Sequence, residues 1–130
     1  MPWHLTTREA VAEVHRVLDE GGSYVVNLID FGPLAFGRAE VATLAEVFAH
    51  VALATEVDTL TGGSRAGGNL VLVASDRPIP VEAVADLTRR RGAAWDVLSG
   101  PELARWSGGA PVLSDEYAPV DQLLTPYSRR

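Results

Sequence analysis

Two polar residues stand at the end of an apolar segment, where they are placed to contact a ligand. Residues 24–29 (YVVNLI) form a short, nearly continuous apolar run, typical of a strand that is covered on both faces. Asn27 lies in this run and Asp30 follows it. Because ligands of open α/β sheets bind at the carboxyl ends of strands, we predict that Asn27 and Asp30 line a substrate pocket. The alternative is that both side chains only satisfy backbone groups of the next loop.

The glycine-rich segment 62–68 (GGSRAGG) suggests a phosphate-binding loop, but its context argues against one. A phosphate loop leads directly into the N-terminus of a helix, whereas this segment leads into residues 69–75 (NLVLVAS), which are typical of a strand. The connection is also too short for the helix of a parallel crossover. We therefore predict a hairpin loop that joins antiparallel strands at 50–56 and 69–75.

Three acidic residues near the C-terminus, Asp115, Glu116 and Asp121, are close enough in sequence to suggest a metal site or an acid/base pair. They lack the alternating ligands and glycine bend of a calcium loop, and the simpler prediction is that they cap the last helix. The histidines share no helical spacing and form no zinc signature. The chain also lacks a G-x-S-x-G nucleophile motif, so we expect neither a metal nor a serine nucleophile.

The composition of the 130-residue chain fits one globular domain, with 47% hydrophobic and 22% charged residues. It contains no cysteine and no lysine, which excludes disulfides, thiolate chemistry, Schiff bases and a P-loop lysine. A net charge of −6 disfavours nucleic acid, and the basic run 89–91 fits a helix end. No signal peptide or membrane-spanning run is present. We predict a cytoplasmic protein that binds neither nucleic acid nor membrane.

Apolar periodicity and capping signals indicate the elements that position these residues. Thr6-x-x-Glu9 has the spacing of a capping box, and Gly21-Gly22 ends the helix that follows. The sequence predicts helices at about 7–19, 38–49, 80–91, 99–106 and 120–124, and main strands at 24–29, 50–56 and 69–75. The predicted fold class is an α/β three-layer half-domain with helices on the faces of the sheet.

Three phrases, in this order along the chain, resemble the spermidine synthase-like family. They are PWHLTTREAVAEVHRVLDEGGSYVVNLID, GGNLVLVASDRP and APVLSDEYAPVDQLL. Members of this family have the class I S-adenosylmethionine-dependent methyltransferase type of Rossmann fold. The resemblance extends over almost the whole chain but only over the C-terminal half of the family, and its most specific part is the last phrase.

The resemblance implies a partial Rossmann-like sandwich that lacks the N-terminal cofactor-binding strands. The strand at 24–29 would be the fifth of seven, with 50–56 and 69–75 as the antiparallel sixth and seventh. The cofactor loop, the acidic residue for the ribose and the catalytic aspartate of the family would precede Met1. Our hypothesis is that Met1 is internal to a longer reading frame, or that the gene is a split or degenerate copy.

The resemblance also bears on the substrate pocket. Asn27 matches the position where aminopropyl-transferring relatives carry a glutamine, and His4 would lie beside the catalytic loop, facing the pocket. The segment 60–63 (LTGG) lacks the tyrosine with which polyamine synthases hold the amine substrate. This absence argues against aminopropyl transfer.

We therefore predict a spermidine synthase-like or methyltransferase-like domain, related to polyamine biosynthesis, that is not catalytic and binds no cofactor alone. Decarboxylated S-adenosylmethionine or S-adenosylmethionine would bind only if the N-terminal half is supplied. The strand at 24–29 would expose an apolar edge, which we expect to be covered by a second copy, a tail segment or a separately encoded N-terminal half. The alternative is a non-catalytic oligomerising interaction or regulatory module.

Overall fold

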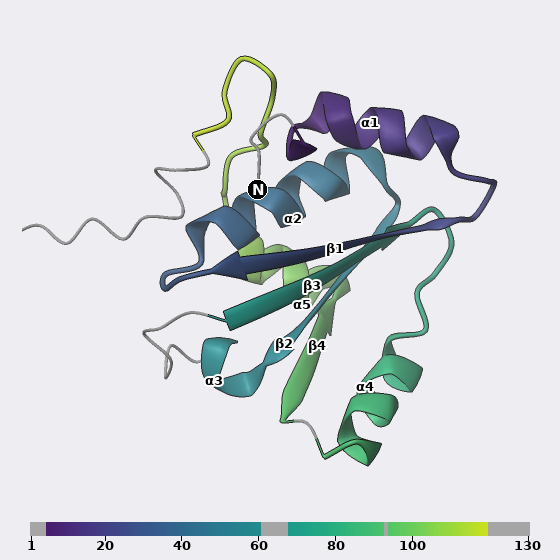
Figure 1. Cartoon of the computed structure of the whole chain (residues 1–130), viewed down its shortest axis with the longest axis vertical. Coiled ribbons are helices and arrows are strands. Elements are labelled where there is room, and N and C mark those ends of the chain that lie inside the picture. The colour runs from purple at the N-terminus through teal and green to yellow at the C-terminus, as the bar shows by residue number, and fades with distance from the viewer. Residues whose placement is uncertain (1–4, 61–67, 93, 120–130) are drawn as a thin grey trace, which may run out of the picture.

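The centre of the structure is a four-stranded sheet (Figure 1). The computed structural model of the protein describes residues 5–60, 68–92 and 94–119. The strands are β1 (Ser23–Asp30), β2 (His50–Glu56), β3 (Gly68–Ser75) and β4 (Trp95–Ser99). Their order is β1-β3-β2-β4, and each strand is antiparallel to its neighbours. The predicted antiparallel pairing of 50–56 with 69–75 is therefore confirmed.

The two faces of β1 have different environments. Val26 and Leu28 point into the core, whereas Val25 and Ile29 on the other face are 60% and 64% exposed. This alternation follows from the two-residue period of a strand. The sequence predicted a strand covered on both faces, which is wrong for the described residues. The helices that pack on β1 cover only one face.

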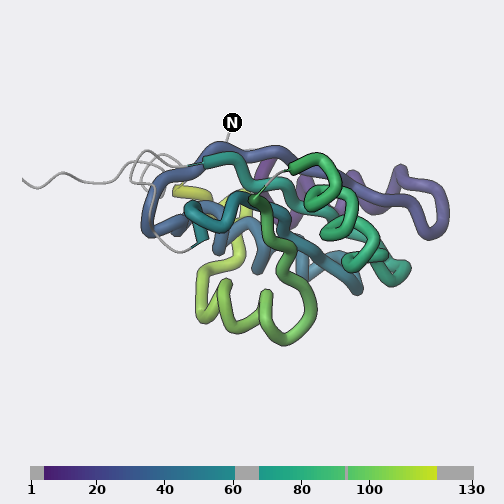
Figure 2. Tube along the Cα trace, turned by 90° about the horizontal axis from the view of Figure 1, so that it is seen from below, coloured from purple at the N-terminus to yellow at the C-terminus, as the bar shows by residue number. Residues whose placement is uncertain are grey.

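Three helices contribute buried side chains to one core. They are α1 (Arg8–Val17), α2 (Ala35–Val47) and α5 (Gly100–Ser107). Figure 2 shows β1 along one side of the molecule and α5 at the other. The larger apolar side chains of this core are those of Val11, Val26, Leu28, Phe36, Val41, Leu44, Phe48, Leu53, Leu70, Leu72, Leu98, Leu103 and Leu113.

Two further helices lie outside this core. Helix α4 (Val81–Arg90) has no fully buried residue and packs against β4. Helix α3 (Val57–Leu60) is a single turn after β2. No helix among the described residues is long and apolar enough to cross a membrane.

The starts of the first two helices differ from the prediction. The N-cap of α1 is Thr7, whose hydroxyl accepts a hydrogen bond from the Ala10 amide, so the capping box from Thr6 to Glu9 is wrong. Helix α2 begins at Ala35, three residues before the predicted start at 38. The carboxylate of Asp30, at the end of the preceding strand, caps the first turn of α2 by accepting a hydrogen bond from the Gly37 amide.

Strand β4 was not predicted. Its five residues include one fully buried side chain, Leu98, which lies opposite Leu53 of β2. So short a segment carries little periodic signal, and its strand conformation depends on pairing with β2. The predicted helix at 120–124 and most of the glycine-rich segment 62–68 lie outside the described residues.

A substitution at Gly37 tests the packing of α2 on the sheet. An added Cβ at Gly37 would overlap Leu70 Cδ1 of β3. Alanine normally stabilises a helix interior by about 1 kcal/mol relative to glycine. We expect Gly37→Ala instead to lower the free energy of unfolding by about 1–3 kcal/mol, because the overlap is with a buried side chain.

Chemical denaturation measures this effect, with Ala45→Gly at an exposed position of the same helix as the control. The control should cost about 1 kcal/mol through propensity alone. A Gly37→Ala protein that is more stable than the wild type would contradict the packing described here.

Candidate functional site

Asp30 ends β1 and holds the first turn of α2. Its side chain is fully buried, and its two carboxylate oxygens accept hydrogen bonds of 2.7 Å from the backbone amides of Phe31 and Gly37. Burial raises the pKa of Asp30, whereas these hydrogen bonds and the charge of Arg38 act in the opposite direction. The carboxylate thus satisfies loop and helix backbone groups, which is the alternative that the sequence left open.

Asn27 lies on the opposite face of β1 from Asp30. It is exposed between Val25 and Ile29 on the open face of the sheet. The structure therefore does not bring the side chains of Asn27 and Asp30 together. The third predicted pocket residue, His4, lies outside the described residues.

Arg38 and Trp106 connect α2 to α5 next to this loop. The Arg38 guanidinium donates hydrogen bonds to the backbone carbonyls of Pro33 and Trp106. Its central carbon lies 4.6 Å from the centre of a Trp106 ring, a cation–π contact. Sequence reasoning missed this pair, because the two residues are far apart in the chain.

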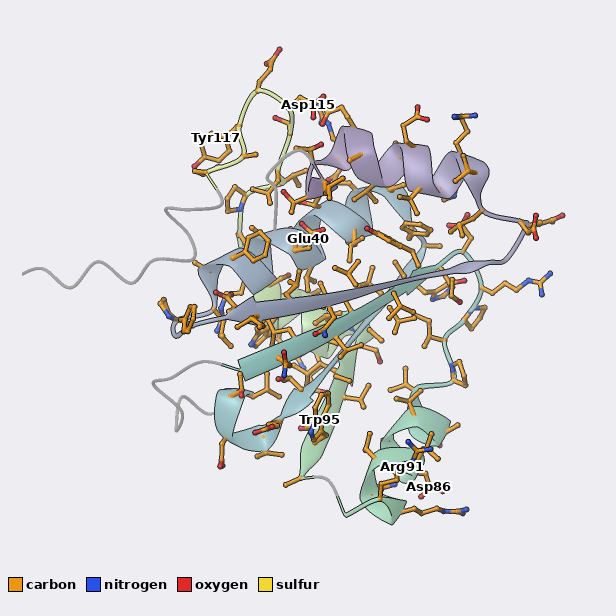
Figure 3. The ribbon with its side chains drawn as sticks, viewed as in Figure 1. Glu40, Asp86, Arg91, Trp95, Asp115 and Tyr117 are labelled. Atoms are coloured by element: carbon orange, nitrogen blue, oxygen red, sulfur yellow. The ribbon has the colours of Figure 1, made fainter. Side chains whose placement is uncertain are left out.

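Glu40 is an acidic residue in the interior of the structure. It lies on α2 between α1 and β1 (Figure 3), and only 1% of its surface is exposed. Its Oε2 has no hydrogen-bond partner. Burial raises the pKa of Glu40 to about 8. Burial also raises the pKa of Tyr24 on β1, and the charge of Glu40 acts in the same direction. The spacing of Glu40 from the apolar residues Phe36 and Leu44, four positions away on each side, was the signal for its burial.

A C-terminal segment, residues 110–117, joins the start of α1 to the second half of α2. The Leu113 carbonyl accepts a hydrogen bond of 2.8 Å from the Arg8 amide, and its amide donates to the Thr43 hydroxyl. The Thr7 hydroxyl donates to the Asp115 carboxylate at 2.7 Å. Asp115 therefore contacts Thr7, the residue that caps the first helix. The predicted last helix at 120–124 lies outside the described residues, so its capping by Asp115 stays a prediction.

Two grooves lie at the other end of the sheet, near the amino ends of β1 and β2. One, of about 380 Å³, has apolar walls from α2 and α5, and the other, of about 390 Å³, lies beside Gly21 and Gly22. In the second groove His15 Nε2 is 2.5 Å from Asp76 Oδ2, and this hydrogen bond lowers the pKa of Asp76. Because the sheet is antiparallel, the carboxyl ends of β3 and β4 lie at this same end, next to the amino ends of β1 and β2. No cluster of three metal-ligating side chains occurs among the described residues.

Comparison with known proteins identifies one solved structure with a similar fold. No protein-family model and no curated protein matches the chain. The crystal structure of a probable spermidine synthase from Corynebacterium glutamicum ATCC 13032 matches it with a TM-score of 0.75 and 30% sequence identity. This chain has a spermidine synthase-like fold. The match covers 88% of this chain and 43% of that chain, so our protein spans less than half the length of its relative. The predicted α/β fold class is confirmed.

The substitution Asp30→Asn tests the structural role of this carboxylate. An amide offers one acceptor where two backbone amides now bind, so one buried donor loses its partner. We expect the free energy of unfolding to fall by about 1–3 kcal/mol. The control is Asn27→Ala on the open face, which should change stability by less than about 0.5 kcal/mol. Equal stabilities of the wild type and Asp30→Asn in urea titrations would show that the cap is dispensable.

Stability should depend on pH through Glu40. The pKa of Glu40 in the folded protein, about 8, lies above its ordinary value of 4.5. Its contribution to the free energy of unfolding is therefore fully present below pH 4.5 and is lost as the pH rises through 8. Between pH 5 and pH 8 the loss amounts to at most roughly 4 kcal/mol. Burial of Asp30 adds to the same trend, so a variant must isolate the part due to Glu40.

Glu40→Gln, which cannot ionise, is that variant. We expect it to match the wild type within about 1 kcal/mol at pH 5 and to exceed it by about 2–4 kcal/mol at pH 8, as measured by denaturant unfolding. Glu46→Gln, at an exposed position of the same helix, is the control and should follow the wild type. Parallel stability curves for the wild type and Glu40→Gln would contradict the buried acid.

Proposed function

We propose that this chain is the substrate-side part of a spermidine synthase-like transferase and is not catalytic alone. The observation that carries this proposal is the match to the Corynebacterium glutamicum protein, which includes most of our chain but less than half of the relative. We call the portion of that protein outside the match the complementary portion. Aminopropyl or methyl transfer would require a polypeptide equivalent to it.

The chemistry explains this requirement. Transfer from a sulfonium donor needs the donor and the accepting amine or other nucleophile held in line. Nucleotide cofactors of Rossmann-type folds bind at a glycine-rich turn between a strand and a helix. Among the described residues no strand leads through a glycine-rich turn into a helix. In this proposal decarboxylated S-adenosylmethionine or S-adenosylmethionine binds after completion, and the described part contributes to the floor of the pocket.

The predicted pocket residues have different roles in this proposal. Asn27 is accessible on the open face of β1, and we propose that it contacts the substrate in the completed protein. Asp30 is buried and capped to α2, so it positions the loop after β1. His4 remains a predicted pocket residue. We place the protein in the cytoplasm, in agreement with its lack of cysteine.

The free edge of β1 supports docking of another polypeptide. All eight residues of β1 pair in regular register with β3, and its other edge has no partner strand among the described residues. The segment 23–30 contains no proline and no lysine, the residues that protect natural edges. The exposed side chains of Val25 and Ile29 lie along the same strand. We propose that either a separately encoded N-terminal half or a second copy of the chain pairs here.

The same surface also favours a second function. An apolar face beside an unpaired strand edge is a typical protein interaction site. An interaction or regulatory module without a small-molecule site would use this surface for association alone. The two functions differ in whether a sulfonium donor binds once the complementary portion is present.

Calorimetric titration separates these functions. We expect the chain alone to give no binding heat with decarboxylated S-adenosylmethionine, S-adenosylmethionine or putrescine. The chain mixed with the purified complementary portion should bind one of the two sulfonium donors. A mixture that forms a complex but binds no donor supports the interaction module. Tight donor binding by the chain alone would overturn our proposal.

A further inference from the structure

The buried acid Glu40 requires contact with water once it ionises. Only 1% of its surface is exposed, and its Oε2 has no hydrogen-bond partner. A neutral carboxyl group is tolerated in such a site, whereas a carboxylate without a counter-charge is strongly disfavoured there. Ionisation of Glu40 therefore favours any opening of the structure that admits water to it.

Helix α1 is the most weakly attached of the elements around Glu40. Glu40 lies on α2, between α1 and β1 (Figure 3). All eight residues of β1 pair with β3, and seven residues of α2 are buried. In α1 only Val11 is fully buried. Detaching α1 would therefore expose Glu40 at a lower cost in packing than moving β1 or α2.

Polar contacts attach α1 at its two ends. At its start, the Arg8 amide donates a hydrogen bond of 2.8 Å to the Leu113 carbonyl. Near its end, His15 Nε2 is 2.5 Å from Asp76 Oδ2, and both side chains are nearly half exposed. Exposed ion pairs contribute little to stability, and a histidine loses its positive charge as the pH rises through the neutral range. A rise in pH thus weakens the attachment at the end of α1.

No charged group of the surrounding elements stabilises the ionised form of Glu40. The charged side chains of α1 form surface pairs, which are Arg8–Glu9, Arg16–Glu13 and His15–Asp76. Asp115 of the C-terminal segment contacts Thr7. Tyr24 of β1 is neutral between pH 5 and pH 8, because burial and the charge of Glu40 raise its pKa. Burial raises the pKa of Glu40, and no charge among the described residues offsets this effect.

We propose that α1 is a pH-dependent lid, which is closed over neutral Glu40 and detaches from α2 and β1 when Glu40 ionises. Residues 18–22 connect α1 to β1 and include Gly21, which has a φ of +72°, so this connection serves as the hinge. The open lid exposes Val11 and the surface of α2 that carries Glu40. The lid operates in the chain alone and does not depend on the proposed function.

Hydrogen exchange at several pH values tests the lid in the wild-type chain. A detached helix of ten residues is unstable on its own, so its amides exchange when the lid opens. After correction for the intrinsic exchange rate, the protection of the α1 amides should fall by about tenfold per pH unit between pH 5 and pH 8, because opening exposes an acid whose ordinary pKa is 4.5.

The β3 amides distinguish the lid from global unfolding. The α1 amides should exchange faster than those of β3, and low concentrations of urea should not accelerate them, because a local opening exposes little surface. If the α1 and β3 amides exchange with equal protection at every pH, the lid is overturned, although the pH dependence of global stability is retained.

Glu40→Gln, which cannot ionise, identifies the group responsible. The protection of its α1 amides should vary with pH by no more than a few-fold, which is the contribution of the His15–Asp76 pair. Glu46→Gln, at an exposed position of the same helix, is the matched control and should show the full dependence of the wild type. A Glu40→Gln protein that keeps the tenfold fall per pH unit would refute our proposal.

Thiol labelling provides a second readout, because the chain contains no cysteine. Val11→Cys places a thiol under the lid, and Val17→Cys, at a position that is 67% exposed on the same helix, is the reference for the reactivity of the thiol itself. The ratio of the labelling rate of Val11→Cys to that of Val17→Cys should rise by about tenfold per pH unit between pH 6 and pH 8. A ratio that does not change with pH would show that α1 stays closed when Glu40 ionises.

Discussion

The position of β3 between β1 and β2 is the constraint on which the rest of the structure depends. β3 is antiparallel to both neighbours, and its alternation sends Leu70 and Leu72 into the core against the helices. A slip of one residue would move both side chains to the open face. This arrangement fixes β1 at the end of the sheet and gives β1 and β2 the same direction.

Two unfavourable features lie near β1, one on each face of the sheet. The outer face of β1 exposes Val25 and Ile29, and Glu40 on the neighbouring helix is buried without a partner for one oxygen. Each feature alone has ordinary precedents in single domains. The exposed apolar side chains, beside an unpaired strand edge and in a chain that spans less than half of its relative, support the proposed interface with further polypeptide.

The sequence predicted those features that depend on local patterns. The bounds of β2 agree at both ends because its apolar run is clear, and α4 agrees within one residue because Pro80 marks its start. The short loop before residue 69 was enough to predict the antiparallel pair. Strand β4 was missed because its conformation comes from pairing with β2, which local sequence does not encode.

The candidate site could be predicted only in part. Asp30 was singled out for its place after a strand, but whether its oxygens faced a ligand or the helix start depended on how α2 returns toward β1. Asn27 was placed in the same pocket, although strand alternation puts it on the opposite face. Glu40 stands at a core position of the stripe of α2, and a fuller use of the helical period would have found it.

Hydrogen exchange of the β1 amides tests the central claim most directly. In dilute, monomeric chain, the amides of residues 23–30 that point away from β3 should exchange rapidly, and they should become protected when the complementary portion binds. Amides that exchange equally fast with and without the bound complementary portion would show that β1 is not the edge at which this fold is completed.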